Sequence, residues 1–435
     1  LMGSLAKCLI ASVFMLSSTI VCAQVGTWSG QLDVQGMKLP LVFHFDKDAC
    51  VMDSPSQGAK GIKAEKECAD GKVKVVVPQI GAKFEGTLAG DSINGIFMQS
   101  GMSFPLTLVR GGYEVDRPQT PTPPFPYSVE NVTFSNDGFS FNGTLVLPPG
   151  CTSQTPVVLM ITGSGQQNRD EEMFEHKPFA VIADFLARRG IASLRYDDRG
   201  YGDTSVAFYR FTTDDFRRDA LAALALLRKR FGKVSVLGHS EGGTIALMLA
   251  AEGKADFIVS LAGMAVSGEE TLIDQNQRML LSMGILPEMA DSYCKALKSA
   301  FGQIVAGRPV SEITPDGVPA SLQPLWNKAL AQVDSPYLRY FITIDTRPLL
   351  VSVRCPVLAL NGTKDTQVDC DANLGALENG LTSCKKTVKA IDGLNHLFQK
   401  CVTGSVAEYS QITETISPDV LALISEWILS QNIGN

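Results

Sequence analysis

Two hydrophobic patterns divide this chain into an amino-terminal and a carboxy-terminal part. From Gln24 to about Gly112, short apolar runs are separated by Gly and Asp, and no long helical period appears. Runs such as Leu39 to Phe45, Val73 to Val77 and Phe104 to Val109 are typical of β-strands. The pattern predicts a small all-β domain of about five or six strands over residues 24–115.

A proline-rich stretch follows this first part. Residues 116–127 contain the run from Arg117 to Pro126, in which proline recurs every few positions. Prolines at this density favour an extended, stiff backbone. We therefore expect a linker here.

From residue 128 to 435, apolar β-branched runs alternate with helical patterns, which indicates an α/β domain with a mostly parallel sheet covered on both faces. Buried strands are predicted at 157–161, 191–196, 234–237, 257–261, 356–360 and 387–391. A helix with one apolar face is predicted from Asp214 to Phe231, and Gly232 ends it.

One interval departs from this alternation. Residues 264–350 separate two predicted strands that a short connection would normally join, and insertions of this length are usually functional. Helical spacing around Met279 to Val305 predicts a helical cap over one end of the sheet. Met279, Met283 and Met289 either line an acyl pocket or pack the cap against the body, and burial is the more common role of methionine.

Length and composition fit a folded protein of two domains. The chain has 435 residues, of which 45% are hydrophobic and 19% charged. A chain of this length exceeds what one core usually serves. The net charge is −7, and Lys and Arg are scattered, so nucleic acid is not expected as a partner.

The first 23 residues have the layout of a signal peptide. A basic region ends at Lys7, an apolar run extends from Cys8 to Val21, and small residues precede Gln24. About 14 apolar residues are fewer than the roughly 20 of a spanning helix, so stable membrane insertion is not expected. We predict a secreted or periplasmic protein; a lipoprotein anchor at Cys22 is the less favoured alternative.

Cysteine usage is compatible with export. Eight cysteines follow the predicted cleavage point: Cys50, Cys68, Cys151, Cys294, Cys355, Cys370, Cys384 and Cys401. An even number permits disulfides without fixing their pairing, and Cys50 with Cys68 is the most local candidate. No C-x-x-C pair exists and histidines are few, so no structural metal site is expected.

The main chemical motif is Gly238-His239-Ser240-Glu241-Gly242, which matches G-x-S-x-G. It follows a predicted strand and precedes a predicted helix, the context of a nucleophile elbow. Such an elbow needs small residues at Gly238 and Gly242, because the backbone turns sharply, and it exposes Ser240 in a strained conformation.

A serine nucleophile needs a base, and His396 is the best candidate among the four histidines. His44 belongs to the β domain, His239 lies within the elbow and His176 precedes the first covering helix. Only His396 follows the last predicted strand, where an α/β-hydrolase places its base. A satisfied surface histidine is the alternative.

The third catalytic residue should be a carboxylate in the loop after the strand at 356–360. Asp365 is the first carboxylate there, and Asp369 and Asp371 follow it. The chain order Ser, Asp, His favours Asp365, with Asp369 as the runner-up.

Hydrolysis also needs backbone donors for the developing oxyanion. One is expected to be the N–H of Glu241, directly after the nucleophile. The other is assigned to Ser164, in the loop from Thr162 to Glu172, with Gly165 as the alternative. A phosphate-binding loop is disfavoured, because no G-K-[ST] follows.

Together these motifs resemble those of bacterial α/β-hydrolase carboxylesterases. The loop from Gly163 to Glu171 is similar to that family's G-S-G and R-D-E, and Gly238 to Gly243 is similar to its G-H-S-E-G-G elbow. The segment Arg195 to Gly202 resembles its loop after the next strand. The resemblance covers about residue 127 to the end and implies cleavage of simple carboxylic esters without a cofactor. A β domain in front is similar, more vaguely, to one often attached to such esterases.

Three functions remain to be compared. The first is an exported serine carboxylesterase acting on short-chain or aromatic acyl esters, with a small molecule or carbohydrate ester as substrate. The second is a serine exopeptidase on the same fold, in which Asp170, Glu171 and Glu172 would bind a free amine. The third, a non-catalytic surface-binding protein, is disfavoured by the intact Ser240, Asp365 and His396. Asp197, Asp198 and Arg199 are interpreted as structural, and the sequence does not determine the oligomeric state.

Overall fold

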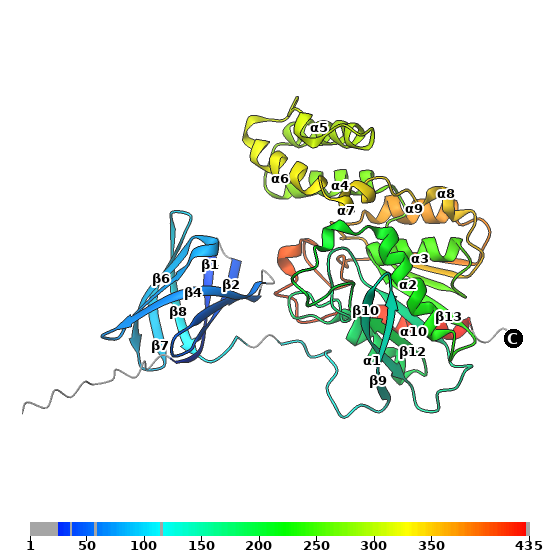
Figure 1. The fold of residues 1–435 in the computed structure, drawn as a ribbon, viewed down its shortest axis with the longest axis horizontal. Helices are drawn as coiled ribbons and strands as arrows, with labels where there is room; N and C mark the ends of the chain where they lie inside the picture. The colour runs from blue at the N-terminus through cyan, green and yellow to red at the C-terminus, as the bar shows by residue number, and fades with distance from the viewer. Residues whose placement is uncertain (1–24, 35–36, 56–58, 114–115, 432–435) are drawn as a thin grey trace, which may run out of the picture. The chain divides into compact units, whose positions relative to one another are not determined.

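The computed structural model describes residues 25–34, 37–55, 59–113 and 116–431, which form two compact units that meet in sequence at Glu114 and Val115 (Figure 1). The predicted signal peptide of residues 1–23, including Cys22, lies outside the described residues. None of the helices described is both long enough and apolar enough to cross a membrane.

The first unit is a closed antiparallel barrel of eight described strands. They are β1 Gly26–Val34, β2 Met37–Phe45, β3 Cys50–Ser54, β4 Ala59–Ala69, β5 Lys72–Val77, β6 Ala82–Ala89, β7 Ser92–Gln99 and β8 Met102–Arg110. Pairing of β1 with β8, in which Trp28 lies opposite Arg110, closes the barrel. The small all-β domain is confirmed, but it has more strands than the pattern predicted, because strands such as β4 turn mainly polar residues outward and have little apolar signal.

Alternation along the strands explains the barrel core. Val73, Val75 and Val77 on β5 are buried, and the residues between them are more exposed. Trp28, Phe43 and Phe84 fill the interior with less than 1% of their surface exposed. The core is therefore apolar and built from strands that pair with their neighbours in sequence.

The candidate disulfide between Cys50 and Cys68 is not formed in the structure. Cys50 on β3 lies opposite Ala64, whereas Cys68 on β4 lies opposite Val73, so the register does not make the two cysteines cross-strand neighbours. No disulfide joins any two of the eight cysteines within the described ranges.

The second unit is built on an eight-stranded sheet in the order β16-β15-β14-β13-β11-β12-β10-β9. Its strands are β9 Ser128–Asn136, β10 Phe139–Leu147, β11 Val157–Ile161, β12 Ala192–Tyr196, β13 Val234–His239, β14 Ile258–Leu261, β15 Val357–Gly362 and β16 Lys386–Ile391. The strands from β11 to β16 run parallel, and the β9–β10 hairpin adds an antiparallel edge that the sequence pattern did not predict.

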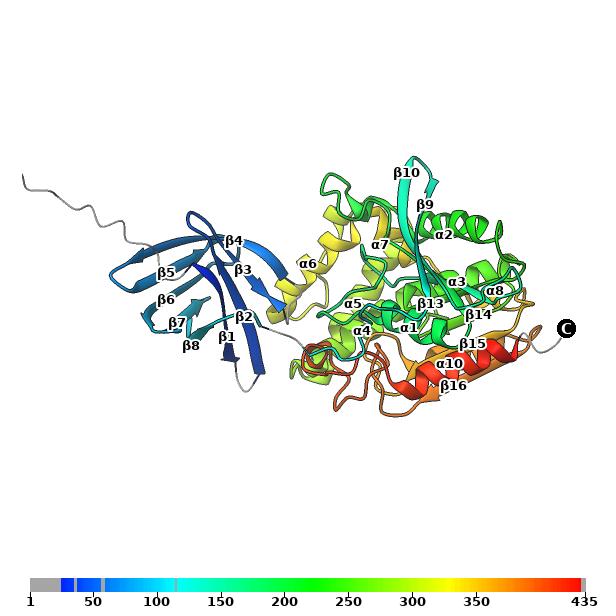
Figure 2. The ribbon, with the colours of Figure 1, turned by 90° about the horizontal axis from the view of Figure 1, so that it is seen from below.

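Helices cover both faces of this sheet (Figure 2). On one face, α1 Pro178–Arg188 and α10 Pro418–Ser430 pack against apolar residues of the strands. On the other lie α2 Thr213–Leu227, α3 Glu241–Ala251 and α9 Cys370–Gly380. The carboxyl ends of the parallel strands therefore meet at one edge of the sheet, where an active site is expected.

The predicted helical cap lies between β14 and β15. It consists of α4 Gly268–Ser282, α5 Pro287–Val305, α6 Gln323–Val333, α7 Pro336–Phe341 and α8 Arg347–Leu350. Trp326, Tyr293 and Phe301 belong to a hydrophobic cluster built by the cap itself.

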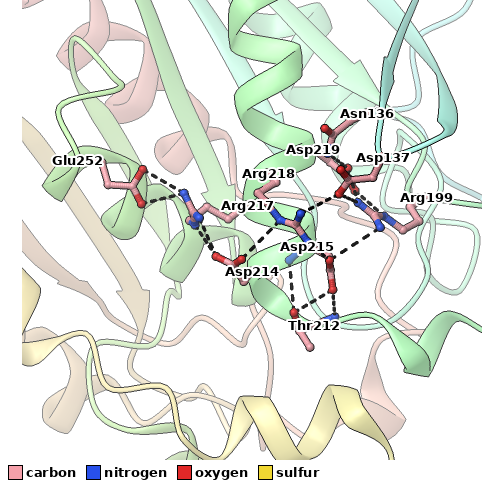
Figure 3. Close-up of polar contacts among 10 residues, drawn as sticks. All are labelled: Asn136, Asp137, Arg199, Thr212, Asp214, Asp215, Arg217, Arg218, Asp219 and Glu252. Atoms are coloured by element: carbon pink, nitrogen blue, oxygen red, sulfur yellow. Dashed lines mark hydrogen bonds and ion pairs between the residues drawn. The ribbon is translucent and has the colours of Figure 1, made fainter.

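A buried ion pair secures the loop after β12 (Figure 3). Arg199 donates to Asp219 of α2 through Nε at 3.0 Å and Nη2 at 2.7 Å, and both side chains are almost fully buried. At the start of α2, Thr212 and Asp215 form a capping box, which satisfies two first-turn donors. The ion pair and the capping box thus fix the loop after β12 and the start of α2. Thr213 is the first residue of this helix and directly follows the N-cap residue Thr212.

Candidate active site

The predicted nucleophile elbow is present between β13 and α3. Ser240 has φ 53° and ψ −122°, a strained combination for a residue with a side chain. A Cβ added to Gly242 would lie 2.0 Å from the carbonyl oxygen of Ile161, and one added to Gly238 would lie 2.0 Å from that of Gly242. Only glycine fits at these two positions, so the turn depends on them.

The loops after β15 and β16 bring Asp365 and His396 together. His396 Nδ1 lies 2.7 Å from Asp365 Oδ2, and both side chains are buried. Asp365 Oδ1 accepts from the N–H groups of Gln367 at 2.8 Å and Val368 at 2.9 Å. These three bonds hold the carboxylate facing the imidazole.

The runner-up carboxylates lie elsewhere. Asp369 Oδ1 caps α9 by accepting from Ala372 N at 2.7 Å, and its Oδ2 pairs with Arg278 of the cap. Asp371 lies in the first turn of α9 and is exposed. Neither is bonded to His396 in the structure.

The remaining histidines have other partners. His44 bonds to Thr27 and Asp53 within the barrel. His176 is fully buried between Thr415 and the carbonyl of Tyr409, and burial lowers its pKa to about 4. Among the four histidines, only His239 and His396 line the pocket that contains Ser240.

That pocket has a volume of about 200 Å³ and combines an apolar wall with amide side chains. Leu272, Tyr337, Leu338 and Phe341 of the cap and Met173 form the apolar part. Gln167, Gln275 and Gln367 supply amides.

The methionines proposed for an acyl pocket do not line it. Met283 is 63% exposed, and Met279 lines a neighbouring groove of about 300 Å³ between α4, α5 and α6. Aromatic and leucine side chains of α4 and α7 take this place because the cap presents those helices to the pocket. The sequence pattern predicted the cap, but not which of its helices faces the nucleophile.

The two residues predicted as oxyanion donors are Ser164 and Glu241. As the first residue of α3, Glu241 has no intrahelical acceptor for its N–H. Ser164 lines the pocket beside Ser240. The N–H of neighbouring Gly163 is already donated to Glu171 Oε1 at 2.6 Å. The structure thus places Ser164 at the pocket and Glu241 directly after Ser240, and their role as oxyanion donors stays a prediction.

The side chain of Glu241 is buried beneath the elbow. It accepts from Thr213 Oγ1 at 2.6 Å and from the hydroxyl of Tyr337 at 2.5 Å. Burial raises the pKa of Glu241, against the effect of these two hydrogen bonds, which lower it. Tyr337 thereby ties α7 of the cap to the residue after the nucleophile, a contact that sequence reasoning missed because the residues are far apart in the chain.

The acidic residues considered for amine binding already have partners. Glu171 is 3% exposed and faces His239. Asp170 lies 3.4 Å from Arg195, and Glu172 lies 3.9 Å from Lys177. These carboxylates therefore serve the protein's own loops, which weakens the exopeptidase interpretation.

The Asp197-Asp198-Arg199 segment has the structural role that was expected. Asp197 accepts from Arg169 Nη2 at 2.5 Å, and Asp198 accepts from Thr162 Oγ1 and from Gln167 N. Burial raises the pKa of Asp198 well above its usual value. The segment holds the loop that carries Ser164.

Named relatives are similar to part of the chain. Esterase EstD from Thermotoga maritima is 28% identical over 288 residues, which cover 63% of this chain and 62% of EstD. Mouse serine hydrolase BPHL is 26% identical over 193 residues, which cover 44% of this chain and 59% of that protein. The chain thus spans about three fifths of these relatives.

Solved structures and a family model are also similar to part of this chain. Est1E from Butyrivibrio proteoclasticus has 18% identity and a TM-score of 0.43, covering 69% of this chain and 98% of its own. A proline iminopeptidase from Mycobacterium smegmatis has 13% identity and a TM-score of 0.43, covering 70% of this chain and 99% of its own. The family model described as alpha/beta hydrolase fold matches residues 156–400, more than half of the chain. The chain belongs to the alpha/beta hydrolase fold family.

Proposed function

We propose that this protein is a serine carboxylesterase that forms an acyl-enzyme on Ser240. The observation that carries the proposal is the 2.7 Å contact between Asp365 and His396 at the pocket that also holds the strained Ser240. Similarity to EstD, named an esterase, supports the same activity.

In the proposed reaction, Ser240 Oγ attacks the ester carbonyl while His396 accepts its proton through Nε2. Asp365 holds Nδ1–H and stabilises the imidazolium. The oxyanion of the tetrahedral intermediate accepts from the N–H groups of Ser164 and Glu241. Collapse breaks the ester C–O bond, and His396 returns the proton to the leaving alkoxide. Water, activated by the same imidazole, then attacks the acyl carbonyl and releases the acid and Ser240.

The pocket favours a small acyl group. About 200 Å³ walled by Leu272, Leu338 and Phe341 suits a short or aromatic acyl chain. We expect activity to fall steeply between the butyrate and octanoate p-nitrophenyl esters, with acyl esters of carbohydrates as candidate natural substrates. Preferential turnover of emulsified long-chain triglycerides would contradict this substrate class.

An activated phosphonate tests the mechanism directly, because it reacts with a serine that a histidine has activated. We expect it to label Ser240, and Ser240→Ala to lose both labelling and about 10⁶-fold in kcat. Near wild-type turnover of p-nitrophenyl acetate by Ser240→Ala would refute the mechanism. Faster cleavage of aminoacyl nitroanilides than of p-nitrophenyl esters would favour the exopeptidase instead.

Export is a separate part of the proposal. It rests on the basic and apolar layout of residues 1–23. Amino-terminal sequencing of the protein from its native compartment should begin near Gln24. Retention of residues 1–23 would refute cleavage without affecting the esterase assignment.

A further inference from the structure

His239 has an oxygen within hydrogen-bonding distance of each of its ring nitrogens. Nδ1 lies 3.0 Å from Glu171 Oε1, and Nε2 lies 2.9 Å from the carbonyl oxygen of His396. A carboxylate and a carbonyl only accept hydrogen bonds, so a neutral imidazole would leave one contact without a proton. Burial works to lower the pKa of His239, but Glu171, the carbonyl of His396 and the charge of Asp365 together outweigh it, and the pKa is raised.

Glu171 is the other half of the arrangement. Its Oε1 accepts from His239 and from Gly163 N, which immediately precedes Ser164 in the oxyanion loop. The side chain is 3% exposed, and the residue has φ 51°, in the left-handed region. Strained backbone of this kind persists where the surrounding structure holds it, often at functional sites.

The two side chains therefore connect three catalytic segments that leave three different strands. The oxyanion loop follows β11, the elbow follows β13, and the loop of His396 follows β16. The rings of His239 and His396 lie 4.7 Å apart, so His239 also packs against the base. A displacement of about 1 Å in such a constellation can reduce catalysis about 10²-fold.

We propose that Glu171 and His239 are a positioning pair that sets Ser164 and His396 in place around Ser240. The inference rests on the serine-hydrolase mechanism proposed above. Neither residue takes a chemical step; they act through the oxyanion loop and through the backbone of the base. Their loss should slow turnover at each active site and leave substrate binding largely unchanged.

The test compares Glu171→Gln and His239→Gln in the full chain, with p-nitrophenyl acetate as substrate. Active serines are counted by complete labelling with an activated phosphonate, so misfolded protein does not enter the rate. We expect kcat per labelled serine to fall about 10²-fold, as when an oxyanion donor is lost. KM should stay within about threefold. If kcat per labelled serine were unchanged in both variants, the proposed positioning role of Glu171 and His239 would be refuted.

Asp184→Asn is the control, because Asp184 is a carboxylate only 18% exposed that pairs with Arg188 and accepts from the hydroxyl of Tyr127, and none of these three residues lines the pocket. It should lower thermal stability but keep kcat per labelled serine within about twofold. An equal loss of kcat in Asp184→Asn would mean that the loss of any paired carboxylate has this effect, and the proposal would fail.

The double variant tests whether the two residues act together. Groups that act as a unit are not additive, so its kcat should lie within about threefold of the slower single variant. Losses that multiply to about 10⁴-fold would contradict a pair.

A measurement on the wild type does not depend on turnover or on the folding of a variant. With ¹⁵N-labelled histidine, one imidazole should keep two protonated nitrogens at pH 8, and that signal should be absent from His239→Gln. A singly protonated His239 at pH 8 would contradict the proposal that Glu171 and His239 act as a positioning pair. Failure of wild-type Ser240 to react with the phosphonate would instead refute the proposed function, so the two failures are distinguishable.

Discussion

The barrel and the hydrolase-fold unit differ in how far apart in the sequence their neighbouring strands lie. In the barrel, every strand pairs with the strand next to it in the chain, apart from the closure between β1 and β8. In the hydrolase-fold unit, β11 lies between β12 and β13, and the cap separates β14 from β15. Local pairing suffices to build the barrel, whereas the sheet edge with Ser240 and His396 needs contacts between distant segments.

The two units also differ in the polar side chains that they bury. The buried polar side chains of the described barrel residues are Ser29 and Ser54. The hydrolase-fold unit buries ionisable groups, among them Glu171, Glu241 and Asp365. Burying a charge is unfavourable unless partners compensate for it, and these groups are bonded around the elbow and the base. The contrast shows that the buried ionisable groups gather in the unit that contains Ser240, His396 and Asp365.

Of the three effects compared here, the largest concerns Asp365, the proposed acid of the triad. Asp365→Asn should lower kcat for p-nitrophenyl acetate about 10⁴-fold, because the amide favours the wrong tautomer of the base. Asp369→Asn is the matched control, since it caps α9 instead, and it should stay within about threefold of wild type. If kcat fell more in Asp369→Asn than in Asp365→Asn, Asp369 would be the acid of the triad instead.

The second prediction compares the hydrophobic core of the barrel with that of the cap. Trp28→Ala in the barrel and Trp326→Ala in the cap each remove a fully buried ring, and each should reduce the free energy of unfolding of its own unit by about 3–5 kcal/mol. Calorimetry with parallel esterase assays should show that only Trp326→Ala affects kcat. Loss of kcat in Trp28→Ala would show that catalysis depends on the barrel.

The smallest effect concerns pH and the buried His176. Its folded pKa of about 4 lies below the unfolded value, so below pH 6.5 the unfolded chain takes up a proton that the folded chain does not. Stability is therefore lost as pH falls, by about 2 kcal/mol between pH 7 and 5 from this group. Denaturant unfolding of His176→Gln should show a decline smaller by that amount. An identical decline in the variant would mean that His176 does not titrate in this way.

The sequence by itself determined the features that depend on local pattern and chain order. Gly238 and Gly242 mark the turn within five consecutive residues, because only glycine tolerates such close backbone contact. The strands from β11 to β16 were predictable because buried parallel strands are short apolar runs. The order of Ser240, Asp365 and His396 narrowed the candidates for the triad.

Only the tertiary structure decided what depends on distance between remote residues. It placed Asp365 rather than Asp369 against His396, because that choice rests on the direction of each side chain. It also paired Glu171 with His239, 68 residues later in the chain. A carboxylate in a sequence has no visible partner, and its role is determined only when folding brings a donor within hydrogen-bonding distance.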